Sequence, residues 1–286
     1  MAIALVTGTS TGIGLATAIT LGRAGHTVYA GMRNLEGAQE LRTVADAEKL
    51  TVTPVQLDVN DEASVKTALG RVLAASSHID VLVNNAGIGG NGPVAETPLE
   101  SFAQVMQTNF FGALRCIKMV LPGMIDRRAG TIVNVTSVSG RIAGASQGPY
   151  VASKFALEGL SETLAQEMKT FNIRVAIVEP GVTATPIFSK AKPPSADPAY
   201  PHQRRLQALF GAMMNPPTSP YVVGQQIREI VEGNSWQLRY PTGTDASVFL
   251  NFRAGISDEE WVAFGALSDA EWTAGVKRYF GLDVTL

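Results

Sequence analysis

The chain has 286 residues, of which 45% are hydrophobic and 17% charged, and its formal net charge is −2. This composition is typical of a folded protein with a sizeable core and excludes an intrinsically disordered chain. The near-neutral charge gives no reason to expect nucleic acid or an acidic membrane surface as a partner. No apolar run approaches the roughly 18 residues of a membrane span, and the N-terminal run is too short for a signal peptide. We therefore expect a soluble, cytoplasmic protein.

Apolar, β-branched runs alternate with helical patterns along the chain. The expected strands are at 2–7, 27–31, 51–57, 79–84, 130–136 and 173–178, with a possible seventh at 236–240. The expected helices are at 12–25, 36–48, 61–76, 99–128 and 150–171. This alternation predicts an α/β fold, a doubly wound parallel sheet with helices on both faces. Ligands of such sheets bind beyond the carboxyl ends of the strands.

A glycine-rich turn stands between the first expected strand and the first expected helix. Its glycines have the spacing Gly-x-x-x-Gly-x-Gly, which differs from the better-known dinucleotide fingerprint Gly-x-Gly-x-x-Gly. Glycine lets the backbone approach a pyrophosphate closely, and the N-terminus of the next helix presents free amides to it. An ordinary turn is the alternative, because glycine is common in turns. The position of the turn favours a dinucleotide site formed by Gly8, Ser10, Thr11, Gly12, Ile13 and Gly14.

A tyrosine and a lysine four residues apart, Tyr150 and Lys154, follow Ser137 in the chain. Residues at i and i+4 lie on one face of a helix. Lowering a tyrosine pKa from about 10 by about three pH units requires about 4 kcal/mol. One charge about 4 Å away at an effective dielectric near 20 supplies that much. Lys154 is therefore predicted to make Tyr150 a general acid or base. The alternative is an ordinary amphipathic helix with a buried tyrosine and a solvated lysine.

Several further motifs accompany these two. In chain order, the full set is Thr7-Gly8-x-x-x-Gly12-Ile13-Gly14, Asp58-Val59, Asn84-Asn85-Ala86-Gly87, Asn109, Ser137, Tyr150-x-x-x-Lys154 and Pro180-Gly181-x-x-x-Thr185. Together they resemble the motifs of the short-chain dehydrogenase/reductase family and span about two-thirds of the chain. The resemblance implies a Rossmann-type fold in its compact single-domain form. The stretch 28–33 and the long C-terminus are similar to those of the steroid and retinoid dehydrogenase branch.

The resemblance implies catalytic roles. Tyr150 donates a proton to the substrate oxygen, and Ser137 hydrogen-bonds the same oxygen. Lys154 lowers the Tyr150 pKa and binds the nicotinamide ribose. Thr136 and Ser139 flank Ser137 and are rivals for its role, but the spacing of thirteen residues to Tyr150 selects Ser137.

The same resemblance assigns further residues to the site. In the family, an asparagine at the place of Asn109 holds a water molecule that resupplies the proton. Asp58 would accept a hydrogen bond from the adenine amino group, although a turn carboxylate is the alternative. Besides the glycine-rich turn, the expected cofactor-binding residues are Arg33, Asp58, Val59, Asn85, Tyr150, Lys154, Val182 and Thr185.

The end of the second expected strand bears on the choice of cofactor. Gly31 stands where an NAD-selective site places a carboxylate on the adenosine ribose. Arg33 would pair with a 2′-phosphate, and Ser10 and Thr11 would add hydroxyl donors. The alternative for Arg33 is a solvated loop residue. We expect NADP(H) rather than NAD(H).

A substrate lid is expected at 186–220, inserted in a dinucleotide-binding and catalytic domain 1–240. Its prolines interrupt any long element, and 206–214 predicts a short amphipathic helix that closes over the nicotinamide or packs on the body. The adaptable Met and Phe side chains of this helix favour a mid-sized apolar ketone or alcohol. Four basic residues there would meet an acidic substrate or form a solvated rim: Lys190, Lys192, Arg204 and Arg205.

A C-terminal extension, 241–286, is expected to pack on the same domain. Two capping boxes, Ser257 with Glu260 and Ser268 with Glu271, predict two short helices, each with a tryptophan to bury. The extension would cover either the substrate cleft or a subunit contact.

The expected function is NADP(H)-dependent hydride transfer between nicotinamide and a carbonyl or secondary alcohol of a mid-sized, largely apolar substrate. One alternative is a non-catalytic dinucleotide sensor, against which the joint presence of Ser137, Tyr150 and Lys154 counts. Another is a sugar-nucleotide epimerase or dehydratase. The resemblance implies a homodimer or homotetramer formed through the helices 99–128 and 150–171. No metal site is expected, because no Cys/His or carboxylate cluster has the spacing of metal ligands.

Overall fold

The computed structural model describes residues 1–188, 200–215 and 217–286. Within them, seven parallel strands form one sheet in the order β3-β2-β1-β4-β5-β6-β7. The strands are β1 Ile3–Thr7, β2 Thr27–Met32, β3 Val52–Gln56, β4 Val81–Asn84, β5 Gly130–Val135, β6 Ile173–Pro180 and β7 Arg239–Thr242. The direction of winding reverses between β1 and β4, and sheets of this kind bind ligands at such a switch point. The predicted fold class is confirmed.

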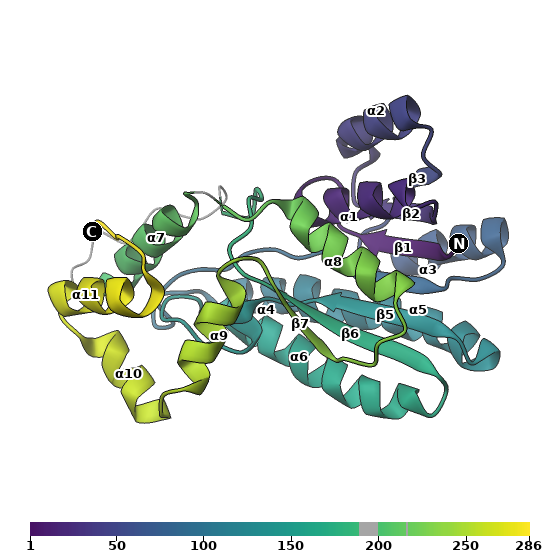
Figure 1. Ribbon diagram of the computed structural model, residues 1–286. Coiled ribbons are helices and arrows are strands. Elements are labelled where there is room, and N and C mark those ends of the chain that lie inside the picture. Colours follow the sequence, from purple (N-terminus) through teal and green to yellow (C-terminus); the bar gives the residue numbers. More distant parts are fainter. Residues whose placement is uncertain (189–199, 216) are drawn as a thin grey trace.

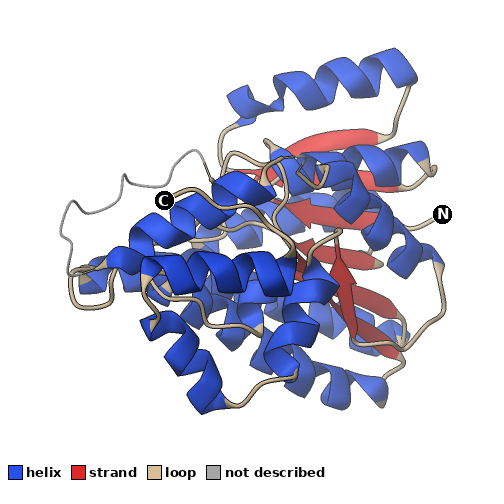
Figure 2. Ribbon diagram, turned by 60° about the vertical axis from the view of Figure 1, so that its left-hand side comes forward, coloured by secondary structure: helices blue, strands red, loops and turns tan. Residues whose placement is uncertain are grey.

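Helices cover both faces of the sheet (Figures 1 and 2). They are α1 Gly12–Arg23, α2 Gln39–Glu48, α3 Glu62–Ser76, α5 Gly112–Arg127, α6 Gly148–Lys169 and α8 Pro220–Glu232. Helices α1, α2 and α8 share one hydrophobic core with Ala4 and Val6 of β1, whereas α3, α5 and α6 share the other core with Leu5. Successive strand residues point to opposite faces, so β1 contributes to both cores. Among the helices of the described residues, none combines the length and the apolar character needed to cross a bilayer.

The helix predicted at 99–128 is interrupted by a π turn. The segments are α4 (Leu99–Met106), the π turn (Gln107–Phe111) and α5. A π turn carries one more residue than an α-helical turn and is frequent at functional sites. The predicted site residue Asn109 lies in this turn and is buried.

Two helices, α8 and α9 (Ala246–Ala254), were not predicted. The prolines at 186–220 predict interruptions of helices, but Pro220 occupies the first turn of α8 after the N-cap Ser219, where proline is favourable. The buried Val223 and Ile227 then place the apolar face of α8 on the sheet. The proline therefore starts a helix at this position.

The helices α7, α9, α10 and α11 gather at one end of the molecule, at the left of Figure 1. Helices α10 (Asp258–Ala266) and α11 (Asp269–Phe280) begin with the two predicted capping boxes, both of which are formed. Helix α7 (Pro201–Met213) contains the predicted amphipathic segment and packs against α11 around Trp272 and Val276.

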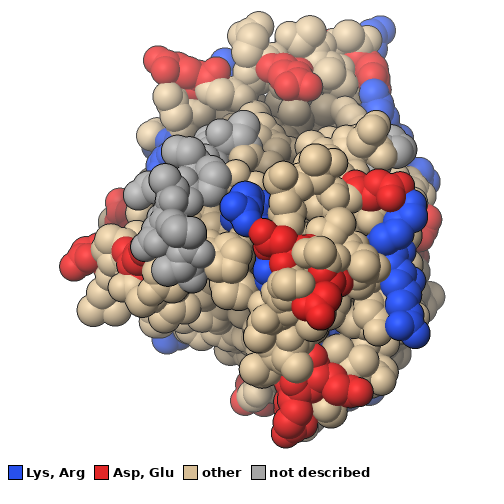
Figure 3. Space-filling model, turned by 90° about the vertical axis from the view of Figure 1, so that its left-hand side faces the viewer, with Lys and Arg blue, Asp and Glu red and all other residues tan. Residues whose placement is uncertain are grey.

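Arg205 ties α7 to the C-terminal helices. This guanidinium is buried, donates to Asp269 Oδ1 at 2.8 Å and donates to the backbone carbonyls of Gly265, in α10, and Leu267, between α10 and α11. Arg204 pairs with the same carboxylate at 2.5 Å. The face that carries these helices shows acidic and basic side chains next to one another (Figure 3). Arg205 is thus no part of a solvated rim, and Lys190 and Lys192 lie outside the described residues.

Candidate active site

A polar seam joins the carboxyl end of β5 to one face of α6. Two consecutive residues at the strand end bond to residues of the helix, Val135 to Lys154 and Thr136 to Glu158, and the next residue, Ser137, lies close enough to Tyr150 to affect its pKa. Helical residues spaced by four share one face, so the seam aligns them in a row. The structure therefore brings the predicted group of Ser137, Tyr150 and Lys154 together, at the carboxyl end of a central strand.

Ser137 is buried at the head of the polar seam. Its side chain interacts with that of Tyr150, and its hydroxyl lies 3.4 Å from the Pro180 carbonyl, to which it donates. The amide of Ser139 donates to the Ser137 hydroxyl at 3.1 Å. The hydroxyl of the rival Thr136 is engaged elsewhere, donating at 2.6 Å to the carboxylate across the seam. Of the three hydroxyl residues considered, Ser137 is the one that the structure places against Tyr150.

The pKa of Tyr150 differs from the prediction. Burial raises the pKa of Tyr150 to about 12, and the hydrogen bond with Ser137 offsets only part of this rise. The Lys154 ammonium lies 5.5 Å from the centroid of the tyrosine ring and donates to the Val135 carbonyl at 2.9 Å. The prediction that the pKa of Tyr150 falls below its ordinary value is wrong for the protein alone. It counted the attraction between the charges and left out the loss of water around the phenolate.

Lys154 is buried, with only 4% of its surface exposed. Burial lowers the pKa of Lys154 to about 8, and the nearby Glu158 carboxylate acts in the opposite direction. The alternative of a solvated lysine is therefore wrong. A buried ammonium with such a pKa can exchange a proton near neutral pH.

Asn109 connects the π turn to the segment after β4 and to α6. Its Oδ1 accepts from the Ile88 amide at 2.8 Å, and its Nδ2 donates to the Ile88 carbonyl at 3.0 Å and to Ser153 Oγ at 2.9 Å. Ser153 in turn donates to the Tyr150 carbonyl at 2.7 Å. Both amide protons of Asn109 are thus used in fixing the backbone around Tyr150. Its predicted role in holding a water molecule stays a prediction.

The glycine-rich turn fits a closely approaching pyrophosphate. Gly8 and Gly12 have φ angles of 72° and 61°, in the left-handed region that glycine tolerates. A Cβ on Gly14 would collide with the Gly8 carbonyl, and one on Gly12 would lie 3.0 Å from Thr185 Cγ2. Thr11, the N-cap of α1, makes no capping bond with its side chain, so no side chain from that position covers the first amides of α1. Both the backbone conformation and the free amides suit an anionic group.

Asn85 fastens the end of β4 to the end of β1. Its Nδ2 donates to the carbonyls of Thr7 and Gly8 at 2.9 and 3.1 Å, and its own amide donates to Thr7 Oγ1 at 3.0 Å. The structure thus gives the Asn85 side chain a role in shaping the glycine-rich turn. Ile13, in the first turn of α1, packs against the core.

The predicted 2′-phosphate partners lie just beyond β2. Arg33 is exposed, and in the described part of the chain no hydrogen bond or ion pair involves its guanidinium. Ser10 lies beside the 3-10 turn that follows, at 35–38. A Cβ on Gly31 would lie 2.7 Å from Leu57 Cδ2, so packing also requires glycine there. The absence of a carboxylate at Gly31 therefore has a structural cause besides cofactor choice.

Asp58 and Val59 follow β3. One carboxylate oxygen of Asp58 accepts from the Asn60 amide at 2.9 Å. This oxygen therefore acts as a turn carboxylate, the alternative to binding the adenine amino group. Val59 is buried and packs on α5, where a Cβ on Gly112 would lie 2.7 Å from its side chain.

A carboxylate from the C-terminal extension holds the loop after β6. Asp245 Oδ2 accepts from the Val182 amide at 2.8 Å, and a Cβ on Gly181 would collide with the same carboxylate. Burial raises the pKa of Asp245. Val182 was predicted to bind the cofactor, and its amide is bonded to Asp245. Thr185, from the same loop, contacts Gly12 of the glycine-rich turn.

Three contributors to this region were not predicted. Glu158 lies one turn beyond Lys154, so extending the i, i+4 pattern by one step would have found it. Ser153 had no such signal, because its importance depends on the position of Asn109. Asp245 is 63 residues from its partner in the chain, and no local pattern marks it.

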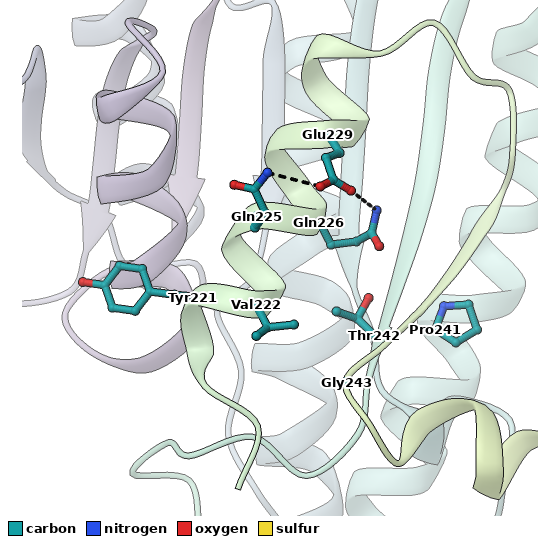
Figure 4. Close-up of a pocket in the computed structure, with 8 residues that line it drawn as sticks. All are labelled: Tyr221, Val222, Gln225, Gln226, Glu229, Pro241, Thr242 and Gly243. Carbon is teal, nitrogen blue, oxygen red and sulfur yellow. Dashed lines mark hydrogen bonds between the residues drawn. The ribbon is translucent and has the colours of Figure 1, made fainter.

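A separate groove lies between α8 and the end of β7 (Figure 4). Its volume is about 450 Å³, and its lining residues are Tyr221, Val222, Gln225, Gln226, Glu229, Pro241, Thr242 and Gly243. The amides of Gln225 and Gln226 donate to the Glu229 carboxylate at 3.1 and 3.5 Å. None of the predicted site residues lines this groove, and its polar groups bond to one another, so we assign it no catalytic part.

Comparisons with known proteins identify relatives of this chain. The chain is 37% identical over 269 residues to an uncharacterized oxidoreductase, YusZ, of Bacillus subtilis, covering 91% of this chain and 95% of the relative. It is 39% identical over 253 residues to retinol dehydrogenase 8 of Homo sapiens, covering 83% and 80%.

Solved structures of known proteins also resemble this chain. A short-chain dehydrogenase from Streptomyces avermitilis matches with a TM-score of 0.79 and 33% identity, over 92% of this chain and 97% of that one. An actinorhodin polyketide ketoreductase solved with NADPH matches with a TM-score of 0.72 and 29% identity, over 83% and 95%. Residues 2–195 match the family described as short chain dehydrogenase. The chain therefore belongs to the short-chain dehydrogenase/reductase family and is an oxidoreductase that transfers a hydride with a nicotinamide cofactor.

Proposed function

We propose that this protein is an NADP(H)-dependent oxidoreductase acting on a carbonyl or secondary alcohol of a mid-sized, largely apolar substrate. The observation that carries the proposal is the polar seam, in which Ser137 lies beside Tyr150 and Lys154 lies one helical turn further along α6. A carbonyl oxygen at the Ser137–Tyr150 pair would meet two hydroxyl donors. Such preorganised donors stabilise the charge that develops on the oxygen in the transition state.

When bound, the nicotinamide cofactor supplies or accepts the hydride. In the reductive direction, Ser137 holds the substrate oxygen and Tyr150 donates the proton to it. Lys154 stabilises the resulting phenolate through its charge, and its pKa of about 8 allows it to pass on a proton. Asn109 fixes the backbone on which this exchange occurs. We propose that it also positions the water molecule that resupplies the proton.

The preference for NADP(H) is supported by charge. Arg33 is exposed next to the glycine-rich turn, with no acidic partner among the residues described. A guanidinium of this kind binds a phosphate through paired hydrogen bonds. Gly31 adds no carboxylate that would repel the phosphate. The related ketoreductase solved with NADPH is consistent with the same preference.

The apolar substrate is supported by the C-terminal helices. Phe252, Trp261 and Phe264 form part of an aromatic cluster. Trp261 Nε1 donates to the Ala143 carbonyl at 3.0 Å, which joins this cluster to the loop before Tyr150. We propose that α7 and residues 241–286 together cover the substrate cleft. The related retinol dehydrogenase has an apolar substrate by name.

Assembly is part of the proposal. Phe111 and Phe155 are exposed at 40% and 43% next to α5 and on α6. Apolar side chains left exposed on helices favour a homodimer or homotetramer formed through them.

The experiment is a screen for oxidation of NADPH and NADH with a panel of apolar ketones, and for the reverse reaction with the alcohols. Consumption of NADPH with a ketone, faster than that of NADH, is expected. Tight binding of cofactor without turnover on any carbonyl or alcohol would favour a sensor instead. Isomerisation of a sugar nucleotide without net use of cofactor would favour an epimerase.

A further inference from the structure

Glu158 has no part in the function proposed above, although it is buried in the polar seam. We propose that Glu158 is a positioning residue of the active site, which holds the Ser137 strand end against α6 and sets a carboxylate one helical turn from Lys154. The inference rests on the proposed function, because Ser137 and Lys154 matter through it.

The Glu158 carboxylate accepts two hydrogen bonds. Glu158 is 4% exposed, and its Oε1 accepts from Thr136 Oγ1 at 2.6 Å. Its Oε2 accepts from Arg239 Nε of β7 at 3.0 Å. Thr136 directly precedes Ser137, so the first bond sets the distance of the Ser137 hydroxyl from α6, which carries Tyr150. Both carboxylate oxygens are thereby occupied, as a buried carboxylate requires.

The carboxylate is confined on its remaining sides. A Cβ on Gly140 would lie 2.8 Å from Glu158 Cγ, so the 3-10 turn after Ser137 rests directly on this side chain. Arg239 is itself held by Glu162, at 2.6 Å, one turn further along α6. Glu158 therefore connects the strand end, the turn after it and β7 to a single point of α6.

Several charged side chains face Glu158. They are Lys154 on the same helix, Arg239 from β7, and Glu179 from β6, which Arg141 pairs with at 3.2 Å. The Glu158 carboxylate raises the pKa of Lys154 against the effect of burial. Removing that charge would lower the pKa of Lys154, and a less negative surrounding would also lower the pKa of Tyr150. Both groups must be protonated in the reductive direction.

The test is Glu158→Gln, which keeps the shape and one acceptor but removes the charge. We expect a lower kcat for ketone reduction with a nearly unchanged KM for NADPH. We also expect the alkaline fall of kcat to move to lower pH by about 1 unit, because the carboxylate close to Lys154 has lost its charge. The matched control is Glu162→Gln, which removes the other carboxylate bound to Arg239 but lies further from Lys154. It should leave the pH profile in place.

A second measurement does not depend on turnover. In the cofactor-free protein, the folded-state pKa of Lys154 lies below its ordinary value, so stability rises as pH increases through that folded-state pKa. In Glu158→Gln this rise in stability should begin at a lower pH. Thermal unfolding of both proteins across the alkaline range measures it. Glu158→Asp retains the charge but shortens the reach to Thr136. It should keep the pH profile of the wild type at a reduced kcat.

The outcomes separate the two proposals. If wild type reduces ketones and Glu158→Gln keeps the wild-type pH profile in both measurements, Glu158 is only a structural residue and the inference is wrong. The same conclusion follows if Glu158→Gln unfolds and Glu158→Asp reduces ketones as fast as wild type. If wild type reduces no ketone while the stability profile shifts as expected, the proposed function fails and the charge coupling in the seam stands.

Discussion

Replacing Lys154 by methionine should make the cofactor-free protein more stable near neutral pH while abolishing turnover. Burial lowers the pKa of Lys154 from 10.5 to about 8. At 1.36 kcal/mol for each pH unit, keeping this ammonium charged costs about 3 kcal/mol at neutral pH. Methionine has a similar length and no charge, so this cost disappears. The Val135 carbonyl loses its donor, which costs about 1 kcal/mol. The net gain is about 2 kcal/mol.

The sign of the pH dependence follows from linkage. The unfolded chain binds the Lys154 proton more tightly than the folded protein, so the stability of wild type rises as pH increases from about 8 to about 10.5. Lys154→Met lacks this rise. Its advantage should therefore be largest at neutral pH and shrink by about 3 kcal/mol at the alkaline end.

The assay is chemical denaturation of both proteins at a series of pH values, with Lys118→Met as control. Lys118 is exposed on α5, so its replacement should give a difference that does not change with pH. A constant difference between wild type and Lys154→Met over this range would refute the reasoning, because a buried, charged lysine must produce the dependence. Lower stability of Lys154→Met at neutral pH would refute the magnitude.

Three further predictions concern the site and the C-terminal helices. Tyr150→Phe should lower kcat by about 100- to 10,000-fold, the usual contribution of a general acid, while NADPH binding followed by fluorescence titration stays close to that of wild type; retained turnover would contradict the assignment. Arg33→Ala should raise KM for NADPH by about 10-fold or more, since a hydrogen bond to a charged group contributes about 1.5–3 kcal/mol, and should leave KM for NADH almost unchanged; equal effects would favour NAD(H). Arg205→Ala should lower the free energy of unfolding by about 2 kcal/mol, because Asp269 Oδ1 and two carbonyls lose the donor that Arg205 provides; an unchanged denaturation midpoint would show that α7 is not held through this residue.

The sheet could be predicted because its signals are local. Runs such as 81–83 and 175–178 are apolar at every position, and turn residues bound them, so each strand was found within a few residues of its place. The π turn could not be predicted, since nothing in 107–111 distinguishes it from an ordinary helical turn. Pro220 was misinterpreted because proline has opposite effects inside a helix and in its first turn.

The site was predicted as a set of residues but not in its energetics. The spacing of Tyr150 and Lys154 placed them correctly on one face of α6, and yet the direction of the tyrosine pKa depends on burial, which spacing does not reveal. Glu158 and Asp245 depend on partners contributed by distant strands and loops. Such contacts arise only when the whole chain has folded.

The anchoring of α7 by Arg205 limits how this protein can be re-engineered for other substrates. A chimera that received α7 from a relative, but kept its own C-terminal helices, would bury a foreign side chain opposite Asp269. A chimera that exchanged only the C-terminal helices would strand the guanidinium of Arg205 instead. Grafts that alter substrate choice should therefore transplant both segments as one module.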